Sequence, residues 1–95
     1  MQEIPEDCAP YRRTRSFTRE TIPAGLLREH STAAGVWGKL NVERGALRYR
    51  VGGREHTLTP RRPGVIAPQQ LHDVAPLTDD VVFHVEFYRR PDAGG

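Results

Sequence analysis

The stretch ALRYRVGGREHTLT, residues 46–59, indicates the fold of this chain of 95 residues. Apolar and charged side chains alternate along residues 46–51, which is typical of a half-buried β-strand. The apolar members of this alternation are Leu47, Tyr49 and Val51. The pair Gly52-Gly53 follows, and two glycines between alternating segments favour the tight turn of a β-hairpin. We therefore expect residues 46–51 and 54–59 to form paired antiparallel strands.

Short segments of the same kind recur along the rest of the chain, separated by turn residues that include nine glycines and eight prolines. We expect further strands at residues 15–19, 26–31, 36–43, 65–67, 71–75 and 81–88. No window of a dozen residues has a convincing helical period of 3.6. Strands this short must hide their edges by closing into a barrel or stacking as a sandwich. The pattern predicts an all-β domain with few or no helices.

The last expected strand, residues 81–88, carries the clearest apolar face of the chain. Its inward side chains are Val81, Phe83, Val85 and Phe87. His84 and Glu86 alternate with them and should project from the opposite face. If the apolar face fills the interior, these two polar side chains point outward.

Length and composition predict one small domain over residues 1–95, with an ordered core at roughly 14–90 and frayed ends. No apolar run reaches the roughly 18–20 residues that cross a bilayer, so we expect no membrane partner. The arginines are scattered among acidic residues, whereas nucleic-acid binding usually needs a concentrated basic face. An acidic N-terminus without a signal-peptide pattern and a single cysteine, Cys8, favour a reducing, cytoplasmic location.

Four histidines, His30, His56, His72 and His84, fall in or beside expected strands. Histidine is the commonest metal ligand, and a catalytic metal site needs about three protein ligands. The alternative without a functional role is that each histidine is a surface residue or a hydrogen-bonded core residue. The chain contains no HxxxH, HxH or CxxC pattern and no GxSxG turn, so the sequence identifies no catalytic residue.

Several segments together resemble the TehB/YeaR-like family of small cupin-like proteins. They are His30 with the glycine-rich run to Leu40, the segment Gly45–Tyr49, the segment Leu71–Val74, the acidic turn Thr78–Asp80 and the closing pair Phe87-Tyr88. The resemblance implies a small β-barrel of cupin, or jelly-roll, type with a cavity at one end, faced by His30 and His72. It also implies an association with tellurite resistance and with nitrate or nitrosative stress. Some relatives carry a fused S-adenosylmethionine-dependent methyltransferase, which we do not expect in this chain.

With this resemblance, we predict a binding protein whose cavity holds a divalent metal ion or a small anionic ligand. His30 and His72 are the expected metal ligands, and zinc, iron, nickel or manganese are the candidate ions. Trp37, Lys39 and Glu86 are the expected ligand-cavity residues. The HxH pair and the glutamate of the first cupin motif have no counterpart here, so a complete three-histidine, one-glutamate site is absent.

Two alternatives remain open from the sequence. One is a metal-dependent oxygenase or isomerase, in which Glu86, or less suitably Glu29, would join the two histidines. The other is an interaction module that acts through the exterior of the barrel, with structural histidines. Small barrels often cover an open edge by pairing, so we also predict a homodimer.

Overall fold

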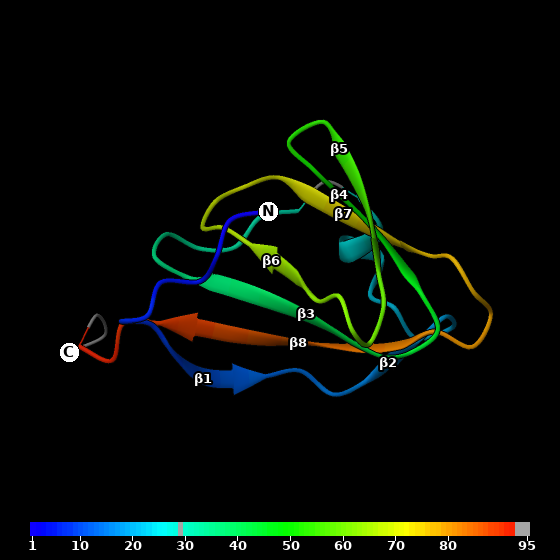
Figure 1. The fold of residues 1–95 in the computed structure, drawn as a ribbon, viewed down its shortest axis with the longest axis horizontal. Helices are drawn as coiled ribbons and strands as arrows, with labels where there is room; N and C mark the ends of the chain where they lie inside the picture. Colours follow the sequence, from blue (N-terminus) through cyan, green and yellow to red (C-terminus); the bar gives the residue numbers. More distant parts are fainter. Residues whose placement is uncertain (29, 93–95) are drawn as a thin grey trace.

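The computed structural model describes residues 1–28 and 30–92, which form two antiparallel sheets. The elements are β1 (Ala9–Arg13), β2 (Phe17–Thr18), the short 3-10 helix η1 (Ala24–Leu27), β3 (Trp37–Arg44), β4 (Leu47–Val51), β5 (Arg54–Leu58), β6 (Gly64–Ile66), β7 (His72–Pro76) and β8 (Val82–Arg89). The larger sheet has the order β1-β8-β3-β6, and β2 also pairs with β8. The smaller sheet has the order β5-β4-β7 and lies across the larger one (Figure 1).

Alternation along the strands builds the core between the sheets. In β3 the buried residues are Gly38, Leu40 and Val42, and in β8 they are Phe83 and Val85. The smaller sheet adds Leu47, Tyr49, Leu58 and Val74, all nearly inaccessible to solvent. The two layers approach closely at Gly64, where a Cβ atom would lie only 2.7 Å from the Leu58 side chain. The central long strands β3 and β8 therefore carry the core and present their other face outward.

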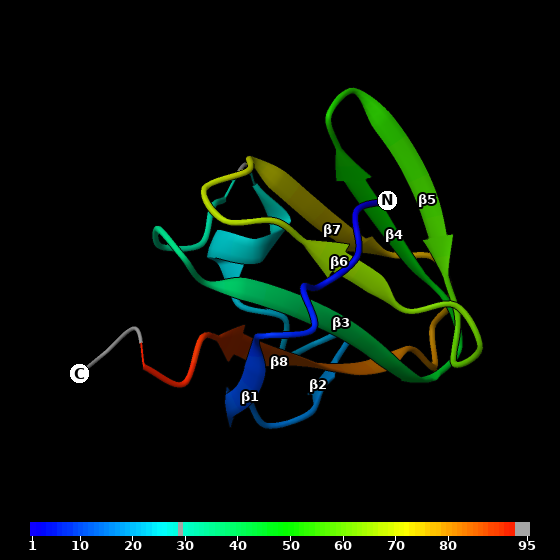
Figure 2. The same cartoon turned by 60° about the vertical axis from the view of Figure 1, so that its left-hand side comes forward.

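The predicted hairpin is confirmed. Leu47 pairs with Leu58 and Val51 pairs with Arg54, and both glycines of the turn have positive φ. Figure 2 shows this β4–β5 hairpin extending away from the larger sheet. A two-residue turn with positive φ at both positions follows the twist of the strands it joins, and glycine adopts that conformation without strain.

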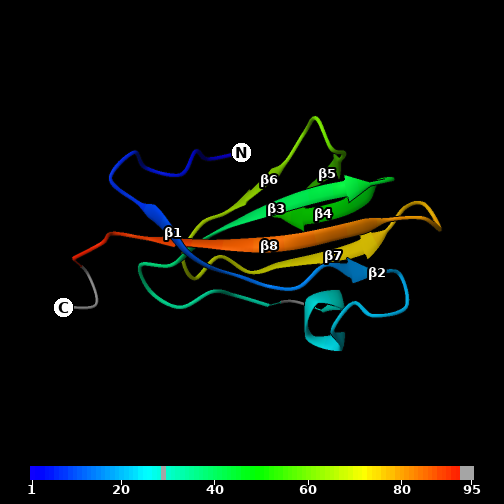
Figure 3. The same ribbon diagram turned by 90° about the horizontal axis from the view of Figure 1, so that it is seen from below.

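The expected strand at residues 26–31 is wrong. Residues 24–27 form η1, and among the described residues of this region only His30 makes a β-bridge. Pro23 precedes the turn with φ −57°, and the Leu26 amide bonds back to the Pro23 carbonyl, so the chain coils before it can pair. Figures 1 and 3 place η1 beside β7. The apolar side chains Leu26 and Leu27 thus belong to a covering turn.

The ordered part begins before residue 14, because β1 pairs with the end of β8 through Ala9 and Arg89. The expected frayed tail lies partly outside the described residues, at 93–95. The all-β class is confirmed, but within residues 1–28 and 30–92 the two sheets stay separate and do not close into a barrel. No helix in the described part of the chain is long and apolar enough to cross a membrane.

Candidate functional site

His30 lies in the segment after η1, and His72 is the first residue of β7. The two residues lie side by side, because this segment, which we call the covering segment, packs against the start of β7. Their backbones form an isolated antiparallel bridge with N–H to carbonyl distances of 2.8 and 2.9 Å. Their imidazole rings lie edge to face, with centroids 5.6 Å apart. The structure therefore brings these two histidines together, and their role as metal ligands stays a prediction.

The His72 side chain has a defined protonation pattern. Its Nδ1 lies 2.9 Å from the Gln70 carbonyl oxygen, which can only accept, so Nδ1 carries the proton and Nε2 keeps its lone pair. Burial lowers the pKa of His72 below its ordinary value of 6.5, and the neighbouring His30 lowers it further. The Gln70 carbonyl and Asp73 act in the opposite direction and do not reverse the shift. At neutral pH His72 is therefore an uncharged imidazole.

Both histidines line a pocket of about 240 Å³ between the covering segment and the sheets. Its other lining residues are mostly apolar and come from both sides: Thr14, Phe17, Pro23, Gly25, Leu26, Thr32, Ile66, Val85 and Phe87. Among the described residues that line it there is no carboxylate and no arginine or lysine. The site is thus an apolar cavity with two imidazoles and two threonine hydroxyls as its polar groups.

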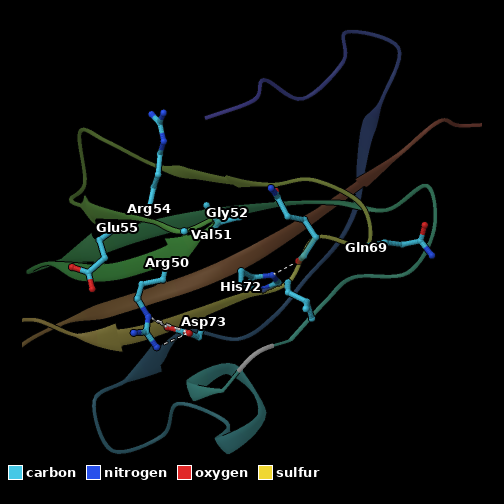
Figure 4. Close-up of a pocket in the computed structure, with 11 residues that line it drawn as sticks. Arg50, Val51, Gly52, Arg54, Glu55, Gln69, His72 and Asp73 are labelled. Carbon is cyan, nitrogen blue, oxygen red and sulfur yellow. Dashed lines mark hydrogen bonds and ion pairs between the residues drawn. The ribbon is translucent and has the colours of Figure 1, made fainter.

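His72 also lines a second, larger cleft of about 800 Å³ beside the β4–β5 turn (Figure 4). In Figure 4 Arg50 and Asp73 point toward each other, with Nε–Oδ1 and Nη2–Oδ2 distances of 3.0 and 2.9 Å. This two-point contact with Arg50 lowers the pKa of Asp73. Asp73 follows His72 in β7 and so projects from the opposite face of the strand. Its carboxylate is bound to arginine on that face and does not join the histidine pair.

The predicted ligand-cavity residues Lys39 and Glu86 lie on the outer face of the larger sheet. Lys39 pairs with Glu86 across β3 and β8, and its neighbours in β3 on either side are the buried Gly38 and Leu40. Lys39 lines a separate surface hollow of about 330 Å³ with Cys8 and Tyr88. The expectation of one cavity that includes Lys39 and Glu86 is therefore not met, because alternation along β3 and β8 turns them away from the pocket.

Two aromatic side chains accompany Lys39 and Glu86 on this outer face. The Tyr88 hydroxyl donates a hydrogen bond of 2.8 Å to Glu86 Oε1, and burial is the main cause that raises the pKa of Tyr88. Trp37 pairs with Tyr88 and shares the face of Lys39. Trp37 is thus not among the residues that line the His30–His72 pocket, so its predicted place in one cavity with these histidines is not met.

The remaining histidines do not extend the site. His84 Nδ1 lies 2.8 Å from Glu43 Oε2, and Ser16 donates a hydrogen bond to the same oxygen at 2.6 Å. Ser16 first, and His84 second, lower the pKa of Glu43. His56 lies on β5 with its ring 6.0 Å from that of Tyr49. Neither ring lines the pocket that holds His30 and His72.

The described residues of the pocket do not supply a complete donor set for a resident catalytic metal ion. Over residues 1–28 and 30–92 there is no group of three or more histidine, cysteine, aspartate or glutamate side chains that could hold one. Glu86 lies on the other face, and Glu29, the other candidate third ligand, lies outside the described residues. Two imidazoles alone do not fit a three-ligand catalytic centre.

Two parts of the site were missed by sequence reasoning. The Gln70 carbonyl, which orients His72, belongs to the backbone and has no residue signature. The apolar walls include Phe17 and Phe87. Phe87 was predicted only as part of the apolar face of residues 81–88, and Phe17 only as part of the strand at residues 15–19. The run Pro68-Gln69-Gln70 before His72 indicated a turn, and that turn places the carbonyl.

Comparisons with known proteins identify the family of the chain. Residues 12–85 match the family model described as a TehB-like domain. The uncharacterized protein YeaR of Escherichia coli (strain K12) is 29% identical over 97% of this chain and 87% of its own length. The TehB protein of Haemophilus influenzae, described as a probable S-adenosyl-L-methionine-dependent methyltransferase, is 32% identical over 82% of this chain.

Solved structures show the same fold. A crystal structure of an Escherichia coli (strain K12) protein superposes with a TM-score of 0.87 at 25% identity, covering 97% of this chain and all of that one. The crystal structure of TehB from Haemophilus influenzae gives a TM-score of 0.83 at 29% identity and covers 90% of this chain. The match spans only 32% of the TehB structure, so most of TehB has no counterpart in this comparison.

Proposed function

The chain belongs to the TehB-like domain family, and on that premise we propose that it is a ligand-binding domain. A small, mostly apolar, uncharged molecule occupies the pocket between the sheets, and His30 and His72 bind its polar end. The observation that carries the proposal is the His72 imidazole in the wall of a mostly apolar pocket, with its Nδ1 bound to the Gln70 carbonyl so that Nε2 keeps its lone pair.

The size and lining of the pocket support a ligand of one ring. Binding pockets for small molecules are largely apolar, with a few polar groups that orient the ligand. An apolar cavity of about 150 Å³ holds benzene, so about 240 Å³ accommodates a ring with one polar substituent. Phe17 and Phe87 offer aromatic surface to such a ring.

The electrostatics favour a hydrogen-bond donor over the anionic ligand expected from the sequence. With Nδ1 bound to the Gln70 carbonyl, His72 presents the Nε2 lone pair, which accepts from a hydroxyl or an N–H group. A carboxylate would meet that lone pair without a counter-charge, because no arginine or lysine is among the described lining residues. Desolvating an unpaired charge is costly.

A divalent metal ion held by His30 and His72 is the second candidate. It is favoured by the Gln70 carbonyl at Nδ1, because ligating histidines usually donate their other ring nitrogen in this way. The ion would need its remaining ligands from water or from a bound molecule. A cupin-type relationship and a role in tellurite or nitrosative stress remain proposals from the family resemblance. A homodimer, from the pairing of open strand edges, and a cytoplasmic location, from the single cysteine and the acidic N-terminus, remain proposals from the sequence.

The proposal is tested with three matched probes: phenol, toluene and benzoate. Titration at pH 7.5, followed by chemical shifts of amides around the pocket, should show phenol binding more tightly than toluene and benzoate binding least. In His72→Phe the preference for phenol over toluene should disappear while toluene still binds, which also shows that the variant is folded. His56→Phe should keep the wild-type order. Equal affinities for phenol and toluene in the wild-type protein would refute the role of the histidines.

A further inference from the structure

The Thr32 hydroxyl connects the two loops that carry the histidines. Thr32 is a buried polar residue, two positions after His30. Its Oγ1 lies 2.9 Å from the Val36 carbonyl oxygen and 3.3 Å from the Gln69 amide nitrogen. A hydroxyl donates one hydrogen and accepts through its lone pairs, so it donates to Val36 and accepts from Gln69. One side chain thus joins the loop after His30 to the loop before His72.

The contact falls on an unusual backbone position. Gln69 has φ 59°, in the left-handed region that side chains other than glycine rarely adopt. Such a conformation is unfavourable for a side chain with a Cβ atom and needs support from its surroundings. The hydrogen bond from its amide to Thr32 supplies that support. The same turn is closed by the Gln70 amide, which bonds to the Ala67 carbonyl at 3.3 Å.

This turn determines where the Gln70 carbonyl points. The carbonyl lies 2.9 Å from His72 Nδ1 and so selects the protonated nitrogen of that ring. We infer that Thr32 is a positioning residue: through the left-handed turn at Gln69 its hydroxyl holds the Gln70 carbonyl against His72 and keeps the Nε2 lone pair available to a ligand. The effect on ligand binding rests on the proposed function, whereas the effect on the tautomer does not.

Thr14 offers a matched control in the same pocket. Its Oγ1 donates to the Arg15 carbonyl at 2.8 Å and accepts from the Val85 amide at 3.0 Å. Thr14 therefore resembles Thr32 in residue type, bonding and location, but its hydrogen bonds within the described part of the chain lead to Arg15 and Val85 and not to the turn before His72. Thr14→Val and Thr32→Val remove the same group from the same pocket.

The test is the histidine tautomer, measured by two-bond ¹H–¹⁵N correlation spectra of ¹⁵N-labelled protein at pH 7.5. Wild-type protein, Thr32→Ser and Thr14→Val should all show His72 with its proton on Nδ1. Thr32→Val should show a mixture of the two tautomers and about tenfold weaker phenol binding, in the range found when a partner that orients a histidine ligand is removed. A folded Thr32→Val variant with unchanged His72 signals would overturn the inference.

Two further measurements distinguish failure of the positioning role of Thr32 from failure of the variant to fold and from failure of the proposed function. If Thr32→Val does not fold, the inference is tested on the wild-type protein. His72 must then show a single tautomer with its proton on Nδ1, and the Gln69 amide must be protected from hydrogen exchange. The lack of either result rejects the inference. If Thr32→Val changes the tautomer but phenol does not bind the wild-type protein, the positioning role holds and the proposed function fails.

Discussion

The hydroxyl of Tyr49 donates a hydrogen bond of 2.8 Å to the carbonyl oxygen of Val65. Tyr49 belongs to β4 of the smaller sheet and Val65 to β6 of the larger one, so this bond joins the two layers. The Tyr49 side chain is fully buried, and burial raises the pKa of its hydroxyl, which stays protonated and available as a donor. The bond therefore helps to set how the sheets lie on each other.

Tyr49→Phe should destabilise the protein by about 1–3 kcal/mol, because the Val65 carbonyl loses a partner in a buried place. Urea unfolding measures the change in the free energy of unfolding. Tyr88→Phe is the control: its hydroxyl bonds to Glu86 on the outer face, where a substitution should cost about 0.5 kcal/mol or less. Equal losses in the two variants would contradict a special role for the Tyr49 bond.

Lowering the pH should weaken folding through His72. Its folded pKa lies below the ordinary value of 6.5, so the unfolded chain takes up a proton first as the pH falls. The contribution of His72 is complete above pH 6.5 and is lost progressively as the pH falls toward the folded pKa. Unfolding free energies measured from pH 8 to pH 5 should decline less in His72→Phe than in the wild-type protein. His56→Phe should decline like the wild-type protein, and identical profiles for all three would speak against a buried neutral His72.

Zinc titration tests the predicted metal site. If His30 and His72 ligate the ion, binding at pH 7.5 should be lost in the double variant His30→Ala/His72→Ala and kept in His56→Ala/His84→Ala. Because ligation needs neutral imidazole, affinity should fall as the pH is lowered from 8 to 5. Calorimetry measures the affinity, and the metal content of protein purified without an affinity tag checks occupancy. Affinity that is the same in both double variants, or flat from pH 8 to pH 5, would exclude histidine ligation.

Several elements could be predicted from sequence because their signals are local. The Gly52-Gly53 pair predicted the β4–β5 hairpin, and the alternating Phe83 and Val85 predicted which face of β8 points into the core. Whether residues 26–31 form a strand could not be predicted from local signals, because a strand forms only where a partner strand lies beside it. Likewise β1 has little apolar alternation, and it is ordered because it pairs with the end of β8.

Parts of the candidate site could likewise be predicted from the sequence, and other parts could not. Histidines and an all-β pattern were visible in the sequence, and the family resemblance selected His30 and His72 among the four. The same reasoning grouped Lys39 and Glu86 with them, although the outward placement expected for Glu86 already pointed to the other face. The pairing of β3 with β8 puts both residues on that outer face.

By itself, the sequence determined the strand-rich class, the main hairpin and the alternation that separates a core face from an outer face, because each depends on neighbours within a few residues. Only the tertiary structure decided that His30 and His72 pair through a β-bridge, that an apolar pocket lies beside them, that Thr32 contacts the Gln69 amide, and that the Gln70 carbonyl contacts His72. These features join segments distant along the chain, and their geometry depends on how the two sheets pack and how the loop between β6 and β7 turns.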